Sequence, residues 1–501
     1  MKIINTNILR ILSVILICMF LFAILSACQG DKNKNANNGN DEINGEQNET
    51  NENDNSETEN IENKEVDYYK NITEELNYDG YDFVIFTYEF ATWPTYVDVE
   101  EIIGEVLNDA AYMRNIEVSE LLGVEISAIH RAPDTMVKTI EQNNSAGESP
   151  YDLILFQATT NVSTLIMQNQ IYDWNKIPFI DLQADWYNQS ANDAFTVNGM
   201  QYLAVSDLSY PVQQHFRYLF NKDLCRNLGL DYPYQLVYDG KWTHDALCRY
   251  AIDVYSDLNG NGKKDKEDQY GIALHPIHLA RSIFCWDELP ISLNNDGFVL
   301  NIFNDRLADM IKDLSDLNSN NKDAFVTSEF GVYYDMFNAG NALFEVFSSD
   351  PTLLRSIETD FGYLPYPKYD DQQKDYITLT TGGNMAVPVS KNENELKRAG
   401  AVIEALSAAS NKYVADAFVS QYIENKILRD EDSVNMYRLM RSTAVYDRAR
   451  FFDTTDLLNE NLAYYTEPIT KGGNLSSQYE KVGQKIELAL EKIYETILEN
   501  Q

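Results

Sequence analysis

The sequence predicts an α/β fold with a parallel sheet, in a body of more than one domain. Short apolar, aromatic and β-branched runs alternate with amphipathic helical stretches in the first part of the body. Strands joined by connections of this length pair in parallel through right-handed crossovers. The body also has about 435 residues, which is more than one hydrophobic core usually organises, so two or more domains are expected.

Three runs suit buried strands, and helical stretches separate them. The predicted strands are residues 82–88, 124–129 and 151–156. The first intervening helix is predicted over residues 100–122, with these apolar side chains largely on one face: Ile103, Val106, Leu107, Ala110, Val118, Leu121 and Leu122. Gly123 is expected to end that helix, and Asp134 to cap a second helix that runs to about Gln142.

Two further helices are predicted near the end of the chain. Ser390 and Glu393 have the spacing of a capping box ahead of an apolar series that runs from Leu396 to Leu406. A last amphipathic helix carries Tyr479, Val482, Ile486, Leu490, Ile493 and Ile497.

The N-terminus has the pattern of a secretory signal. Lys2 and Arg10 precede an apolar run from Ile11 to Ile24, which is shorter than the ~20 apolar residues that a membrane-spanning helix needs. Leu25-Ser26-Ala27-Cys28 resembles the lipobox of bacterial lipoproteins, in which the cysteine is lipidated, with palmitate among the acyl chains expected. The alternative is an ordinary signal peptide whose cleavage site happens to contain a cysteine.

A polar, acidic stretch follows Cys28. Residues 29–65 are nearly all Asn, Glu, Asp and Gly, with Ile43 and Ile61 as the only large apolar side chains. Such a segment buries too little apolar surface to fold, so we expect a disordered tether. The predicted boundaries are a signal peptide over 1–27 and the lipidated cysteine with its tether over 28–66.

Charge and cysteine content exclude some classes of function. The formal net charge is -39, whereas binding to nucleic acid needs a basic surface. Only three of the five cysteines, Cys225, Cys248 and Cys285, lie in the body, which is too few for a disulfide framework. Whether any two of them pair is left open.

Motifs along the whole body resemble those of one family. They are YDL (151–153), NDAAYMRN (108–115), DWY (185–187), NGMQY (198–202), FNK (220–222), DGKWT (239–243), DQYG (268–271) and FGYLPYP (361–367). Together with the lipobox and tether they resemble extracellular solute-binding proteins of family 1, the ABC-transporter receptors grouped with maltose- and oligosaccharide-binding proteins. Each motif alone is weak evidence for this family, and the order of the motifs along the chain is what makes the resemblance specific.

The resemblance implies a periplasmic-binding-protein-like fold of type II, in which two α/β lobes are joined by a hinge and hold the ligand in a cleft between them. By analogy the chain crosses near residues 208, 376 and 440. Lobe 1 is then 67–208 plus 377–440, and lobe 2 is 209–376 plus 441–501. The mechanism implied is closure around the ligand, followed by docking on a membrane permease.

A calcium site is predicted without reference to the family. Residues 257–268 have the spacing of an EF-hand loop, with Gly262 at the sixth position for the sharp turn. The ligand positions hold Asp257, Asn259, Asn261, Lys263 through its carbonyl, Asp265 and Asp268. Asp268 stands where a bidentate Glu is usual, which predicts weaker Ca²⁺ binding. The role expected is structural, and the alternative is a surface turn without metal.

Catalysis has little support in the sequence. No nucleophile elbow, H-E-x-x-H motif or P-loop occurs. His275 and His278 have helical spacing, but Pro276 disfavours helix at His275, which favours a structural role. We therefore expect a protein that is not an enzyme.

Ligand-binding residues are expected beyond the carboxyl ends of the strands, where open parallel sheets hold their ligands. A sugar needs aromatic platforms and polar side chains around them. The candidates are Tyr88, Glu89, Trp93, Gln157, Trp186, Asp207, Tyr210, Trp286, Asp287, Gly383 and Asn384. A core position is the alternative for each tryptophan, and it is the preferred one for Trp242.

The predicted function is a monomeric receptor that binds a sugar or oligosaccharide for an ABC importer. It would be lipid-anchored on the outer face of the cell membrane, in a bacterium of Gram-positive type, and its partners would be the permease subunits. The alternatives are a receptor for another solute, such as a peptide or polyamine, and a surface-anchored hydrolase or adhesin. The sequence does not name the sugar or its affinity.

Overall fold

The structure is a computed structural model that describes residues 66–89, 95–148, 150–157, 160, 162–209, 214–348, 351–381, 383–459 and 462–500. They all belong to one of the two units of the chain, Val66–Gln501. The predicted signal, lipobox and tether lie outside the described residues, as do the ligand candidates Trp93 and Tyr210. Among the described helices, none combines the length and the apolar content that crossing a membrane requires.

The first sheet has the order β15-β3-β1-β2. Its strands are β1 (Tyr81–Tyr88), β2 (Val124–Arg131), β3 (Leu153–Phe156) and β15 (Asn384–Ala386). β1 pairs in parallel with both β2 and β3, and β15 joins β3 antiparallel. The three predicted strands and their parallel pairing are therefore confirmed.

The helix after β1 begins later than the sequence predicts. α2 spans Val106–Leu122 and ends at Gly123, whose φ of 63° confirms the predicted stop. Residues 100–105 are not helical, because the Asp109 carboxylate accepts hydrogen bonds from the backbone N–H groups of Ile103 and Gly104. Of the apolar side chains predicted to share one helical face, Ile103 lies before the helix, and both Ile103 and Leu121 are exposed.

Two predicted caps are shifted along the chain. α3 spans Pro133–Ala146 with Ala132 at the N-cap, so Asp134 lies in the first turn and caps nothing. α12 spans Glu393–Ser410, and its capping box consists of Asn392 and Glu395, not Ser390 and Glu393. In both cases the residue at the cap is the last one with extended backbone, which spacing alone does not reveal.

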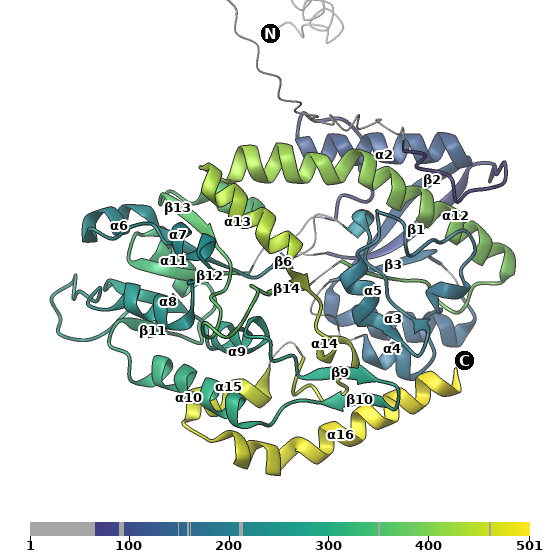
Figure 1. Cartoon of the computed structure of the whole chain (residues 1–501). Helices are drawn as coiled ribbons and strands as arrows, with labels where there is room; N and C mark the ends of the chain where they lie inside the picture. Colours follow the sequence, from purple (N-terminus) through teal and green to yellow (C-terminus); the bar gives the residue numbers. More distant parts are fainter. Residues whose placement is uncertain are drawn as a thin grey trace, which may run out of the picture. The chain divides into compact units, whose positions relative to one another are not determined.

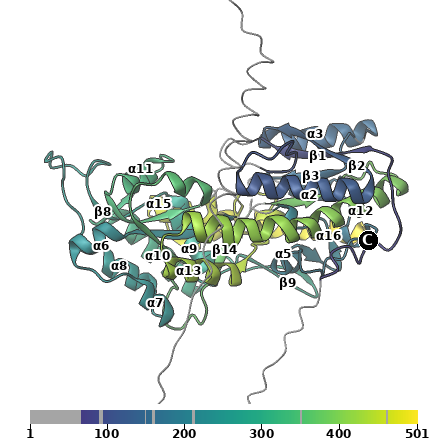
Figure 2. The same cartoon turned by 90° about the horizontal axis from the view of Figure 1, so that it is seen from above.

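Further short elements complete the part around the first sheet. They are α4 (Ser163–Met167), η1 (Trp174–Lys176), α5 (Gln189–Phe195), β4 (Thr196–Val197), β5 (Met200–Gln201) and η2 (Asp207–Ser209). α12 lies beside α2 in both views (Figures 1 and 2). It continues directly into two π-helical segments, η4 (Asn411–Ala415) and η5 (Ala417–Ile427).

The second sheet is mixed and has the order β11-β8-β12-β7-β13. Its strands are β7 (Arg217–Asn221), β8 (Tyr270–Leu274), β11 (Ala324–Val326), β12 (Ala342–Phe347) and β13 (Phe361–Leu364). The neighbouring helices are α6 (Lys222–Leu228), α7 (Tyr234–Tyr238), α8 (His244–Ala251), α9 (Pro276–Cys285), α10 (Asp305–Ser319), α11 (Val332–Asn338) and η3 (Pro351–Ser356). Trp242 is fully buried here, which confirms its predicted core position.

A small third sheet lies between the other two (Figure 1). It consists of β6 (Gln214–His215), β14 (Thr378–Thr381) and β16 (Ala444–Val445). These strands lie near the predicted crossings at 208, 376 and 440. Most of α13 (Glu431–Ser442) falls in the sequence range predicted for lobe 1. However, Ser433 Oγ of α13 accepts a hydrogen bond from the N–H of Tyr363 in β13. This helix therefore packs on the second sheet.

The remaining elements are the hairpin β9 (Ile291–Asn294) and β10 (Gly297–Leu300) and the helices α14 (Ala449–Phe452), α15 (Ala463–Lys471) and α16 (Leu475–Glu499). The predicted C-terminal helix is confirmed, with Ile486, Leu490, Ile493 and Ile497 buried. The predicted lobe boundaries stay a prediction.

Candidate functional site

The first sheet gathers five of the predicted ligand residues at its carboxyl edge. Tyr88 ends β1, and Glu89 follows it. Gln157 follows β3 directly, while Asn384, paired with Phe156, begins β15 just after Gly383. Glu89 is exposed, whereas Tyr88, Gln157 and Asn384 are buried.

Gly383 has a different role from the predicted close approach to a ligand. Its φ of 71° favours glycine, and an added Cβ would lie 2.9 Å from Cβ of Ser209. The glycine therefore allows β15 to pass close to the end of η2, which is another part of the protein chain. The tight approach fixes the position of Asn384 at the edge of the sheet.

The carboxyl edge of the second sheet carries a cation and two aromatic rings. Arg217 begins β7 opposite Phe347, the last residue of β12, and its guanidinium lies 4.7 Å from the centre of that ring. His275 follows β8 and caps α9, accepting a hydrogen bond from the N–H of Ile277. The prediction that Pro276 disfavours helix at His275 is confirmed, because His275 has extended backbone at the N-cap.

Phe330 presents an open aromatic face near this edge. Its ring stacks on His275 with centres 4.1 Å apart and planes 17° apart, and 72% of the residue is exposed. An exposed phenylalanine held flat by a second ring is a platform for an apolar ligand face. The sequence gives no sign of it, because the contact joins the loop after β11 to the residue after β8.

Short connections join the two carboxyl edges. Gln214 of β6 pairs with Thr381 of β14. One residue separates the end of β6 from Arg217 at the edge of the second sheet. Two residues separate the end of β14 from Asn384 at the edge of the first sheet. The third sheet therefore lies between the edges at which α/β sheets bind ligands, as a hinge between two lobes requires.

Trp286 and Asp287 lie away from this edge, so their prediction as ligand residues is corrected. α9 begins at the edge, and Trp286 follows its last residue, about 15 Å farther along the helix. The indole is buried, donates to the carbonyl of Pro367 at 3.1 Å and packs against His244 and Tyr369. Asp287 is exposed next to it, in a left-handed conformation.

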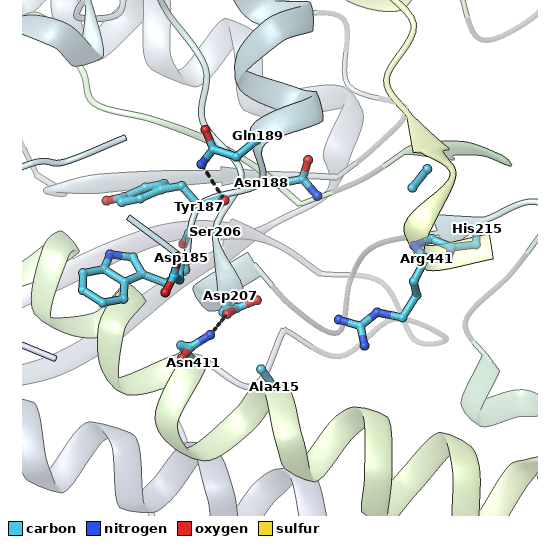
Figure 3. A pocket seen from close by; sticks show the side chains of 12 residues that line it. Asp185, Tyr187, Asn188, Gln189, Ser206, Asp207, His215, Asn411, Ala415 and Arg441 are labelled. Atoms are coloured by element: carbon cyan, nitrogen blue, oxygen red, sulfur yellow. Dashed lines mark hydrogen bonds between the residues drawn. The ribbon is translucent and has the colours of Figure 1, made fainter. Parts of the chain in front are cut away.

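Trp186 and Asp207 line a separate cavity of about 310 Å³, which we call the hinge cavity (Figure 3). It is bounded by Asp185, Trp186, Tyr187, Asn188, Gln189, Ser206, Asp207, His215, Asn411, Ala415, Arg441 and Ala444. Trp186 is buried against Tyr68, with ring centres 6.5 Å apart, so its face is not a platform. Asp207 accepts from Nδ2 of Asn411 at 2.7 Å, and burial raises its pKa to about 6.

The loop 257–268 adopts part of the conformation that a calcium loop needs. The Asp257 carboxylate accepts from the N–H groups of Gly260 and Gly262, and Gly262 has a φ of 69°. Asp268 is fully buried and accepts from the N–H groups of Leu258 and Asp265. The donor set is all oxygen, which suits Ca²⁺. No group of three or more metal-binding side chains gathers among the described residues, so their carboxylates would have to converge.

All three cysteines of the body are free. Cys225 and Cys285 are buried, while Cys248 is partly exposed, with Sγ 3.7 Å from Nε2 of His244. Burial raises the pKa of each thiol, to about 11 for Cys248. Thiols in this state are poor nucleophiles and ligands at neutral pH.

Comparisons with known proteins identify the fold. No family model and no curated protein sequence matches the chain. An ABC substrate-binding protein of Listeria monocytogenes solved with cycloalternan is 12% identical, with a TM-score of 0.55 over 84% of this chain and 99% of that one. A cyclo/maltodextrin-binding protein complexed with maltotetraose is 13% identical, with a TM-score of 0.55 over 84% and 97%.

A third solved structure has a different kind of ligand. UgpB of Mycobacterium tuberculosis in complex with glycerophosphocholine is 12% identical, with a TM-score of 0.56 over 82% of this chain and 98% of that one. At these identities the comparisons show the fold. The chain has the two-lobed α/β fold of ABC solute-binding proteins, which confirms the fold class and the resemblance predicted from the sequence.

Proposed function

We propose that this protein is the lipid-anchored receptor of an ABC importer, which closes on a sugar or oligosaccharide and delivers it to a membrane permease without chemical turnover. The observation that carries the proposal is the third sheet, β6-β14-β16, which lies between the carboxyl edges of the other two sheets. A ligand at this place contacts both lobes, so it favours the closed arrangement by the difference between its affinities for the open and closed forms.

A carbohydrate fits the groups that the two edges supply. Phe330 offers an exposed ring for the apolar face of a sugar, while Glu89 offers an exposed carboxylate that can accept hydrogen bonds from its hydroxyls. Two of the solved structures described above hold oligosaccharides, which supports the same class. The glycerophosphocholine complex of UgpB shows that the fold also accepts a non-sugar solute, so both ligand classes belong in the test.

Ligand binding is tested by thermal shift and calorimetry with maltotetraose, cycloalternan and glycerophosphocholine. We expect an oligosaccharide to raise the melting temperature, because a ligand that binds only the folded state stabilises it. Phe330→Ala is expected to weaken that binding about fivefold, from the loss of about 1 kcal/mol of ring contact.

Phe303→Ala is the matched control for this variant. Phe303 is also an exposed ring, 48% accessible, stacked on Tyr479 with planes 16° apart, but it lies ahead of α10 and not at the carboxyl edge. Its removal should leave the affinity unchanged. If only glycerophosphocholine binds, or if no ligand does, the carbohydrate proposal fails.

The anchor at Cys28 is a separate part of the proposal. Lipidation of Cys28 and a tether of about 37 residues would keep the receptor within reach of its permease. Cys28→Ser is expected to move the protein from the membrane fraction to the medium. Cys18→Ser, within the apolar run, is the control and should stay with the membrane. Equal membrane retention of both variants would contradict lipidation at Cys28.

We also propose that loop 257–268 binds Ca²⁺ as a structural ion in the second lobe. Asp257 and Asp268 would supply carboxylate oxygens, and the carbonyl of Lys263 a further ligand. After treatment with a chelator, calorimetry is expected to show one Ca²⁺ bound, in the submillimolar to millimolar range that extracellular modules show. Asp257→Ala should abolish the binding, and Asp296→Ala, in another exposed turn, should not. Absence of a binding heat at millimolar Ca²⁺ would exclude the site.

A further inference from the structure

Two polar side chains of α2 hold the loop that follows β1. Nη2 of Arg114 donates to the carbonyl of Tyr96 at 2.6 Å, and Nε of Arg114 donates to Oδ1 of Asn115 at 2.9 Å. Nδ2 of Asn115 in turn donates to the carbonyl of Val97 at 2.9 Å. The two side chains therefore fix consecutive peptide groups of the loop, and we call this arrangement the Arg114 clamp.

The clamped backbone has a conformation that its side chains do not favour. Tyr96 has a φ of 49°, in the left-handed region that a bulky residue rarely adopts. Thr95 is 5% exposed and Val97 is fully buried, so the loop is packed on both sides of Tyr96. A backbone of this kind persists only where the surrounding contacts determine it. The Arg114 clamp supplies such contacts.

Arg114 is a costly residue to bury at this position. It is 1% exposed, and burial lowers its pKa to about 10, so it is still charged at neutral pH. Within the described part of the chain no carboxylate pairs with it, and Nη1 has no hydrogen-bond partner. A buried charge without a counterion destabilises the folded state. Proteins tolerate costs of this kind mainly at functional sites.

The clamped loop lies where a ligand is expected. It connects Glu89, at the carboxyl edge of the first sheet, to the start of α2. Nε2 of His130, near the end of β2, lies 2.9 Å from the carboxylate of Asp98 in the same loop. At the end of the loop, Glu105 comes within 3.9 Å of Arg355 in η3, which follows β12 of the second sheet. The loop thus borders the ligand edge of one sheet and contacts the part of the protein around the other.

We propose that Arg114 is a positioning residue for ligand binding, because it holds Tyr96 and Val97 in the conformation that the loop needs around the ligand. This inference rests on the proposed function as a receptor. A loop that is already held in its bound conformation loses less entropy when the ligand arrives. The clamp therefore raises the affinity without touching the ligand. It also presents Glu105 to Arg355 in a fixed geometry.

The test is a double-mutant cycle in ligand affinity. Calorimetry uses maltotetraose, cycloalternan or glycerophosphocholine, whichever raises the melting temperature of the wild type. Arg114→Gln is expected to weaken binding by about tenfold, because the ligand must then order the loop. Asn tolerates the left-handed conformation, so in the Tyr96→Asn background the same change should weaken binding by no more than about twofold. A purely structural Arg114 would lower the melting temperature in both backgrounds and give no such coupling in the affinity.

A second variant keeps the buried charge in place. Asn115→Ala removes one link of the clamp, the hydrogen bond to Val97, and does not alter Arg114 itself. It is expected to weaken binding by about threefold, as the loss of one hydrogen bond does. This variant decides the question if Arg114→Gln does not fold.

Arg429→Gln is the matched control, because Arg429 also donates to two backbone carbonyls, those of Ile357 and Thr359. Both precede β13, whose first residue pairs with the last residue of β7, at the opposite end of that strand from Arg217. Its removal should lower the melting temperature and leave the affinity unchanged.

The outcomes separate this inference from the proposed function. Equal losses of affinity in the two Tyr96 backgrounds would overturn the inference and leave the proposed function intact. Unchanged binding by both Arg114→Gln and Asn115→Ala would do the same. If the wild type binds none of the three ligands, both proposals fail.

Discussion

Asp152→Ala is expected to lower the free energy of unfolding by about 3–5 kcal/mol, the usual cost of leaving one member of a buried ion pair without its partner. Asp152 and Lys391 are both 1% exposed, and Nζ of Lys391 lies 2.9 Å from the Asp152 carboxylate. The same carboxylate accepts from the backbone N–H of Val84 and from the hydroxyl of Tyr81. It therefore ties β1, the start of β3 and the segment after β15 together.

The measurement is chemical denaturation of the wild type and the variant, with the midpoint and slope compared. Glu74→Ala is the matched control, because Glu74 also forms an ion pair, with Lys397 at 2.8 Å, but both side chains are about half exposed. An exposed pair contributes about 0–1 kcal/mol, so the control should be nearly neutral. A loss below about 1 kcal/mol for Asp152→Ala would show that the buried pair does not hold the first sheet together.

The strands of the first sheet could be predicted because their signal is local. Residues 82–88, 124–129 and 151–156 are compact apolar runs between turn residues, and their pairing follows from the length of the connections. The predicted start of α2 is wrong because the Asp109 side chain binds the backbone of Ile103, a contact that periodicity does not encode. The caps of α3 and α12 differ for a similar reason, since several residues near each start could serve.

The edge residues could be predicted because parallel strands end at the same side of a sheet. Tyr88, Glu89, Gln157 and Asn384 meet there through the register of three strands. The sequence does not distinguish a ligand-binding position from a core position for Trp186 and Trp286. Both are buried, and an aromatic side chain near a strand or helix end also occurs in the core. Phe330 was missed, since its partner His275 belongs to another strand end and the stack exists only after folding.

Glu404→Gln is expected to change how stability depends on pH. Glu404 of α12 is fully buried, and its carboxylate accepts from Nδ2 of Asn71 at 2.6 Å and from the hydroxyl of Tyr187 at 2.9 Å. Burial raises its pKa from 4.5 to about 7, against the lowering effect of those hydrogen bonds. The folded state thus holds a proton that the unfolded chain releases at lower pH.

The direction in which stability changes with pH follows from this difference in proton binding between the folded and unfolded states. A carboxyl with a raised folded-state pKa contributes its full stability below pH 4.5 and loses it as the pH rises to 7. The loss in the wild type is about 3 kcal/mol, at 1.36 kcal/mol for each pKa unit. Gln does not titrate. The free energy of unfolding of Glu404→Gln, relative to that of the wild type, should therefore rise by about this amount between pH 4 and pH 8.

Denaturation at several pH values measures this difference, and Glu393→Gln on the exposed first turn of α12 is the control, which should follow the wild-type profile. The quantity to compare is the difference in free energy of unfolding between each variant and the wild type, because the other carboxyls are common to both proteins. Asn71 belongs to the segment that directly follows the tether range, and Tyr187 to the loop of the hinge cavity. A parallel pH profile for Glu404→Gln and the wild type would mean that Glu404 stays ionised and that these two segments are held by other contacts.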